Sequence, residues 1–222
     1  GPQLIEKLKD GLMIALVSDA GMPAICDPGS DMVRLALEAD IPIVPLPGAN
    51  AGLTGLIASG MDTTRFTFVG FLPKTQKHRL PVLESVKAYE GTLIFYEAPH
   101  RIQQVLGEML EVLGDRRAVL CRELTKKHET AWQTTIEDAI TRYEQEDPKG
   151  ECVLVIEGRS QKEIEDEAKA AFEEISIEEH MKRYEDQGIA RKEAMKLVAK
   201  DRGVTKRDIY QYLLGKESYN DF

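Results

Sequence analysis

The sequence has 222 residues, of which 42% are hydrophobic, and its formal net charge is −9. This length permits one or two domains with a sizeable core. The acidic balance argues against a uniformly basic nucleic-acid-binding surface, although it leaves room for local basic patches. The three cysteines, Cys26, Cys121 and Cys152, lie far apart, so they predict neither a disulfide framework nor a metal site and fit a reducing cytoplasm. No apolar run approaches the roughly 18 residues of a membrane span, and no signal peptide is recognised.

The first part of the chain is organised around a loop at 18–29. Residues 4–9 predict the end of a helix, and the apolar run 13–17 predicts a buried strand. The loop then brings two glycines, two prolines and two aspartates before a helix predicted over 30–39. A plain turn between a strand and a helix needs only a few residues. A stiff, glycine-containing loop after a strand therefore indicates a ligand-binding loop at the carboxyl edge of a sheet.

A second unit of the same kind follows. Residues 41–46 predict a strand whose prolines suit its ends or a sheet edge. The turn 47–52 leads into a helix over 51–59, for which Asn50 is the expected N-cap. Small residues early in this helix would let another backbone or a ligand lie close to it.

Further along, alternating strands and helices predict a second α/β domain. Strands are expected at 66–71, 92–96, 118–121, 129–134 and 151–156, and helices at 79–89, 99–113 and about 136–145. Thr135 and Asp138 resemble a capping box at the start of the last of these helices. The fold class is therefore α/β, with the remainder of a first domain at 1–62, a second domain at 63–160 and a smaller part at 161–222.

The C-terminal part changes sign along its length. Residues 160–179 contain eight acidic residues against two lysines and predict a solvated linker or helix face. Residues 180–216 contain ten Lys or Arg against five Asp or Glu, a net of +5. Helical periodicity on both sides of Gly203 fits either a helix-turn-helix or a helical hairpin that closes the fold, and the sequence does not choose between them.

The loop motif and five other blocks carry a family resemblance. In order and spacing, the chain closely resembles the tetrapyrrole-methylase-like S-adenosylmethionine (SAM) methyltransferases, and among them the enzymes that act on ribosomal RNA (rRNA) of the small subunit. The blocks that support the resemblance are 15–23 with 27–29, 44–48, 70–73, 93–97 with His100 and Arg101, 122–126 with Glu129, and 150–158. The family usually has serine where Cys26 stands.

The resemblance also implies that the first domain is incomplete in this sequence. In the family, a strand, a loop with Gly and Pro and further βα units precede the position that matches Leu4. Two strands cannot form a stable α/β domain unaided. We therefore expect either a longer natural chain or a truncated piece with doubtful activity.

The resemblance implies that SAM binds in a cleft between the two α/β domains. The expected cofactor-binding residues lie on the first loop, on the second turn and after the strand at 92–96: Asp19, Ala20, Gly21, Met22, Ile25, Asn50, Ala51 and Glu97. Methyl transfer from a sulfonium to oxygen requires alignment above all, and no metal is expected.

The resemblance implies methylation of the ribose 2′-hydroxyl of a cytidine in the decoding centre of 16S rRNA. Candidate groups for handling the hydroxyl proton are Glu123, Lys126 and Glu129, although phosphate binding or mutual pairing would also explain them. Expected RNA-binding residues are Lys77, Arg79, Lys200, Arg202, Lys206 and Arg207, because contacts to phosphate need cations.

Two other functions remain open at this point. One is a methyltransferase of the same fold that acts on a tetrapyrrole or another small molecule, because fold alone does not select a substrate. The other is a nucleic-acid-binding regulator built on the basic tail. The resemblance further suggests a homodimer in the cytoplasm.

Overall fold

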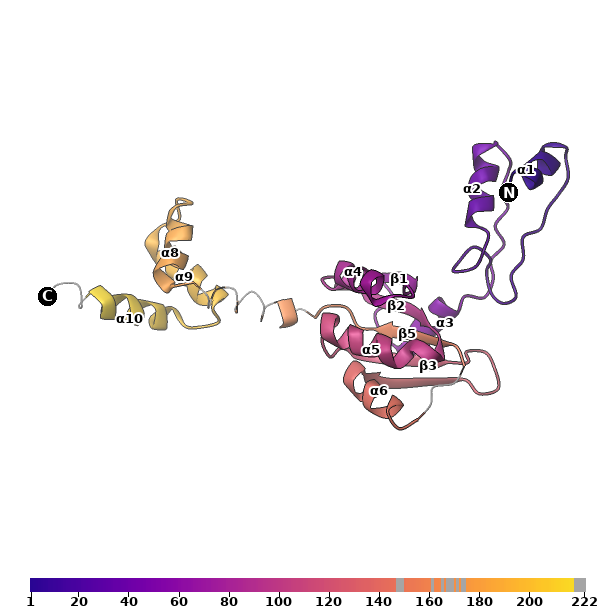
Figure 1. Cartoon of the computed structure of the whole chain (residues 1–222). Helices are drawn as coiled ribbons and strands as arrows, with labels where there is room; N and C mark the ends of the chain where they lie inside the picture. The colour runs from indigo at the N-terminus through magenta and orange to yellow at the C-terminus, as the bar shows by residue number, and fades with distance from the viewer. Residues whose placement is uncertain are drawn as a thin grey trace. The chain divides into compact units, whose positions relative to one another are not determined.

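The computed structural model describes residues 1–146, 150–160, 162–164, 166, 170, 172 and 175–217. The chain divides into two compact units, Gly1–Gly158 and Arg159–Phe222, whose helices and strands are labelled in Figure 1. Part of the acidic stretch at 160–179, including half of its acidic residues, lies outside the described residues. The division of the chain at residue 62 remains a prediction.

Unit 1 contains a five-stranded mixed sheet in the order β1-β2-β5-β3-β4. Strands β1 and β2 run parallel, whereas β5 is antiparallel to both β2 and β3, and β3 is antiparallel to β4. The strand bounds are β1 Phe66–Phe71, β2 Thr92–Glu97, β3 Arg117–Arg122, β4 Thr130–Thr135 and β5 Cys152–Ile156. All five strands expected after residue 62 are therefore confirmed, within a residue or two at their ends.

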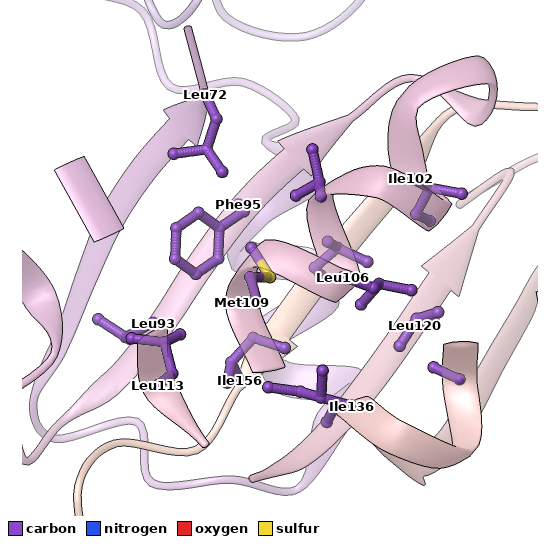
Figure 2. Close-up of a cluster of buried hydrophobic side chains, with 14 of the residues drawn as sticks. Leu72, Leu93, Phe95, Ile102, Leu106, Met109, Leu113, Leu120, Ile136 and Ile156 are labelled. Carbon is purple, nitrogen blue, oxygen red and sulfur yellow. The ribbon is translucent and has the colours of Figure 1, made fainter. Parts of the chain in front are cut away.

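Helices cover both faces of this sheet. Helices α4 (Gln76–Val86), α5 (Pro99–Leu113) and α6 (Ile136–Tyr143) contribute to the larger core, part of which Figure 2 shows around Phe95, Leu106 and Met109. Helix α3 (Ala51–Ser59) packs on the other face through Leu56, against Ile94 and Val155. The Thr135 hydroxyl accepts a hydrogen bond from Asp138 N at 3.2 Å, which confirms the cap at the start of α6.

The two strands expected before residue 62 do not form. Residues 12–18 and 41–50 are described as irregular backbone, between α1 (Pro2–Lys9), α2 (Ser30–Glu38) and α3. The side chains of Met13, Val17 and Val44 are 98%, 80% and 79% exposed. A strand needs a neighbouring strand to satisfy its backbone N–H and C=O groups. No strand among the described residues pairs with either stretch, so the prediction of strands was wrong for this chain.

In unit 2 the structure gives bounds for the helices α8 (Ile177–Glu185), α9 (Arg191–Asp201) and α10 (Lys206–Glu217). A small apolar core joins them through Met181, Val198 and Ile209. Gly203 has φ +64° between α9 and α10, and the Thr205 hydroxyl accepts from Asp208 N while an Asp208 carboxylate oxygen accepts from Thr205 N. The expected order of helix, glycine turn and helix is present, and the choice between a helix-turn-helix and a hairpin stays open.

Candidate active site

The loop at 18–29 folds back on itself and meets the second turn. The Ser18 hydroxyl lies 2.9 Å from the carbonyl oxygen of Gly21, and Met22 N donates to the carbonyl oxygen of Ala49 at 3.0 Å. Gly21 has φ +78°, and a Cβ at this position would lie 3.0 Å from the Ala49 oxygen. The structure therefore brings together the two glycine-containing loops that carry most of the predicted cofactor residues.

Asn50 fixes the second loop at the start of α3. Its side-chain oxygen accepts a hydrogen bond from Leu53 N at 2.9 Å, which confirms the predicted N-cap. Another backbone N–H at the start of α3, that of Gly52, donates to the Tyr96 hydroxyl at 2.8 Å. Through this bond the C-terminal end of β2 is tied to the same helix start.

Tyr96 lies beside the start of α3, although it was not among the site residues predicted from the sequence. Its ring packs edge-on against Phe68 and Phe71, with centroids 5.0 and 5.4 Å away. Burial raises the pKa of Tyr96, and Cys26 and Asp27 on the first loop raise it further, so the phenol keeps its proton. Its position at the end of a predicted strand, beside the ligand loops, was the signal that could have identified it.

Gly70 on β1 provides another contact between the sheet and the first loop. This glycine has φ +73°, and a Cβ here would come within 2.7 Å of the Cys26 sulfur. The ends of β1 and β2, the loop at 18–29 and the start of α3 therefore form one cluster, which we call the loop cluster. It offers backbone groups and a phenol donor to a ligand.

Glu97 points away from the loop cluster. Side chains alternate between the faces of a strand, and Tyr96 lies on the face of α3 while Glu97 lies towards α4 and α5. The Glu97 carboxylate is 1% exposed, accepts from Ala98 N at 2.8 Å and is 3.3 Å from an Arg101 nitrogen. Burial raises its pKa despite these partners. The prediction that the Glu97 side chain binds the cofactor is therefore wrong, because the carboxylate is buried and already paired with Ala98 N and Arg101.

The three predicted catalytic residues lie together in the loop between β3 and β4. Lys126 Nζ is 3.1 Å from a Glu123 carboxylate oxygen, and Thr125 N donates to Glu129 at 2.5 Å. The hydrogen bond from Lys126 lowers the pKa of Glu123, with help from Glu151 N. Glu123 and Thr125 adopt positive φ angles of 52° and 65°, a costly conformation for such residues. In the described parts of the chain, no hydrogen bond or ion pair joins this loop to the loop cluster.

The predicted RNA-binding residues differ in what they can contact. Lys77, Lys200 and Arg207 are exposed, and Lys206 is half-buried. Arg79 is 2% exposed and pairs with Glu108 through two nitrogens at 2.6 Å, so its assignment as an RNA contact was wrong. Arg202 donates to the carbonyl oxygens of Ile175 and Ser176 at 2.6 and 3.1 Å and to His180 Nδ1 at 3.2 Å, so it anchors the start of α8.

The residues that the structure describes contain no group of three or more His, Cys, Asp or Glu that could hold a metal ion. None of their helices is both long and apolar enough to cross a membrane.

Comparisons with known proteins extend these observations. Residues 2–140 match the family model described as tetrapyrrole (corrin/porphyrin) methylases. The chain is 48% identical to ribosomal RNA small subunit methyltransferase I of Halalkalibacterium halodurans and 45% identical to the protein of the same name in Bacillus subtilis. Each match covers 95% of this chain and 72% of the relative.

Solved structures with low sequence identity share the fold. The methyltransferase CobJ superposes with a TM-score of 0.55 at 19% identity, covering 71% of this chain and 69% of CobJ. A diphthine synthase superposes with a TM-score of 0.53 at 17% identity, covering 71% of this chain and 64% of that protein.

Proposed function

The chain belongs to the tetrapyrrole (corrin/porphyrin) methylase family, and from this we propose that it is a SAM-dependent methyltransferase of small-subunit rRNA. The substrate class rests on relatives that are 48% and 45% identical to this chain over the aligned residues and are named as small-subunit rRNA methyltransferases. We further propose the finer reaction, methylation of a cytidine 2′-hydroxyl in the decoding centre of 16S rRNA. A homodimer in the cytoplasm completes the proposal.

The observation that carries the cofactor proposal is the loop cluster. Gly21 and Ala49 lie in contact without an intervening side chain, and the Tyr96 hydroxyl lies at the start of α3. Backbone groups at Asp19, Ala20 and Met22, with the side chain of Ile25, would hold the cofactor, while Asn50 and Ala51 would position it from the second loop. SAM, when bound, supplies an activated methyl group on a positively charged sulfur.

Residues of this chain would do the remaining work on the RNA. Alignment of the ribose hydroxyl is the main requirement, and a base that takes its proton contributes typically about 10²–10⁴-fold. Glu129 is the best placed of the three candidates, because among the described residues its carboxylate accepts a hydrogen bond only from Thr125 N. Glu123 is bound to both Lys126 and Glu151 N, which makes it a weaker base. Lys126 serves as the partner of Glu123.

The central experiment measures methyl transfer. Labelled SAM is incubated with the full chain and either naked small-subunit rRNA or assembled small subunits, and the labelled nucleotide is mapped. We expect one labelled cytidine with the methyl group on its 2′ oxygen. Label on a base or on no RNA at all would contradict the proposed reaction.

Cofactor binding is tested separately with Gly21→Val. This change adds a side chain where the two loops touch, so it should abolish SAM binding measured by calorimetry. Gly114→Val is the matched control, because Gly114 also has a positive φ of +81° but nothing within 4 Å of its added Cβ. Equal SAM affinity in the two folded variants would place the cofactor elsewhere.

The tail is tested with Lys200→Gln, Lys206→Gln and Arg207→Gln together. Loss of these charges should weaken RNA binding and flatten its salt dependence, while SAM affinity stays unchanged. Arg202 is left intact because it anchors α8. An unchanged salt slope would show that the tail only closes the fold or contacts another subunit.

A further inference from the structure

The segment that follows β1 is held by two arginines from different helices. Arg79 of α4 donates from Nη1 to the carbonyl oxygens of Pro73 and Lys74 at 3.3 and 2.7 Å. Arg101 of α5 donates from Nη2 to the carbonyl oxygens of Leu72 and Pro73 at 3.0 and 3.2 Å. Three consecutive carbonyl groups outside any strand are thereby fixed in place.

Each arginine is in turn held by an enclosed carboxylate. Arg79 and Glu108 form a two-pronged pair whose side chains are 2% and 5% exposed, and Gln104 adds a bond to Glu108 at 3.2 Å. Arg101 pairs with Glu97, which is 1% exposed. A buried pair of this kind tolerates desolvation only when its remaining donors are satisfied. The carbonyl groups of 72–74 accept from Arg79 Nη1 and Arg101 Nη2, whereas Arg101 Nε is buried without a hydrogen-bond partner. The Arg79 pair in particular therefore depends on the segment, and the segment depends on both arginines.

This arrangement also sets where the segment lies relative to the loop cluster. Tyr96 and Glu97 are adjacent at the end of β2 and face opposite sides of the sheet. Tyr96 is tied to α3 by the bond from Gly52 N, and Glu97 is tied through Arg101 to Leu72 and Pro73. On the other side, Phe71 precedes the segment and touches Tyr96. One strand end therefore connects the segment to the proposed cofactor site.

The segment carries cations that are not neutralised nearby. Lys74 and Lys77 are exposed, and neither has an ion-pair partner among the residues the structure describes. By contrast, Lys87 at the other end of α4 pairs with Glu84, and Lys126 pairs with Glu123. The Thr75 hydroxyl lies 2.9 Å from His78 Nδ1, which orders the start of α4 between the two lysines. The result is two free positive charges on a backbone that cannot easily move.

From these contacts we infer that residues 74–78 contact the phosphate backbone of the substrate RNA, and that Arg79 and Arg101 are positioning residues for that contact. The inference rests on the proposed function, since the RNA partner comes from it. Fixed cations beside the methyl-transfer site would place the ribose at a set distance from the cofactor, which is what a displacement reaction needs. A purely structural clamp would stabilise the fold without affecting RNA.

The charges are tested with the double variant Lys74→Gln/Lys77→Gln in the full chain. We measure filter binding of small-subunit rRNA over a range of salt concentrations, which requires no methyl transfer. Loss of two phosphate contacts should weaken binding several-fold at low salt and reduce the slope of log affinity against log salt by about 1.5. Lys87→Gln, which removes one exposed charge at the far end of α4, should leave both quantities unchanged.

The positioning role is tested by replacing the buried pair with apolar residues of similar size, Arg79→Met/Glu108→Met. Such replacements often preserve stability, and this one removes the bonds to Pro73 and Lys74 without touching a surface charge. RNA affinity should fall several-fold while SAM affinity stays at the wild-type value. In this background the two lysine changes should have less effect than in the wild type.

A second variant, Arg79→Lys, is used if the chain with Arg79→Met/Glu108→Met does not fold. Arg79→Lys keeps a charge opposite Glu108 but lacks the planar fork that reaches both carbonyl groups, so it should reproduce the loss of RNA affinity. The inference is overturned if Arg79→Lys binds RNA like the wild type. It is also overturned if Lys74→Gln/Lys77→Gln weakens RNA binding equally with and without Arg79. A wild-type chain that binds RNA through these lysines but methylates none would contradict the proposed function and leave this inference standing.

Discussion

The two parts of unit 1 use their apolar residues in opposite ways. In the sheet, Leu93, Ile94 and Phe95 are fully buried, and every strand has a hydrogen-bonded neighbour. In the preceding part, residues as apolar as Val17 and Val44 are largely exposed on irregular backbone. Composition alone does not separate these stretches. What separates them is the presence of partner strands, since an apolar β-prone run becomes a strand only where another strand completes its hydrogen bonds.

The largest effect that this comparison predicts is for Phe95→Ala. Phe95 lies in the centre of the larger core (Figure 2), so the change leaves a cavity and should lower the free energy of unfolding by about 3–5 kcal/mol. Denaturant unfolding measures it. The control Phe66→Ala alters a residue of the same type that is 38% exposed at the start of β1. Equal losses in the two variants would mean that the sheet is not packed as described.

The sequence predicted the sheet better than the site for a physical reason. Each strand after residue 62 has a recognisable run of apolar and β-prone residues, and the strands that pair with it lie between residues 66 and 156. Tyr96 and Glu97 could not be distinguished this way, because the face that each occupies depends on register and on which helix covers it. The burial of Arg79 was missed for the same reason, since its partner Glu108 lies on another helix.

The contact between the two parts is tested by Gly70→Ala. The positive φ at Gly70 alone should cost about 1–2 kcal/mol of stability, and the new Cβ would also collide with the Cys26 sulfur. Cys26→Ala in the same chain removes that sulfur and should recover the part of the loss that the collision causes. Strictly additive effects of the two changes would show that the first loop does not rest on β1.

A smaller loss is expected at the helix that joins the two parts. Asn50→Ala removes the acceptor for Leu53 N and should cost about 1 kcal/mol in thermal or denaturant unfolding. Asn50→Asp retains an acceptor at the N-cap and should retain most of the stability. If alanine and aspartate are equally destabilising, the side-chain bond does not hold the start of α3.

Unit 2 differs from both parts of unit 1 in having a buried histidine, His180, in its small core. His180 lies beside Asp201 and Arg202 and stacks on Tyr184, and burial, followed by the charge of Arg202, lowers its pKa. The folded state therefore favours neutral His180. Its contribution to stability is full above the unfolded pKa of about 6.5 and is lost as the pH falls towards the lower folded value. Unfolding of His180→Gln should lack this part of the pH dependence, and an identical pH profile would argue against a buried neutral imidazole.

The smallest effect should come from the apolar residues that the comparison leaves exposed. Val17→Ser and Val44→Ser change side chains that are about four-fifths exposed, so the free energy of unfolding of this chain should change by less than about 0.5 kcal/mol. Val119→Ser, in the buried middle of β3, is the matched control and should be strongly destabilising, because it removes apolar burial and adds a hydroxyl to the core. A large loss from Val17→Ser would show that residues 13–17 are packed against a partner in solution.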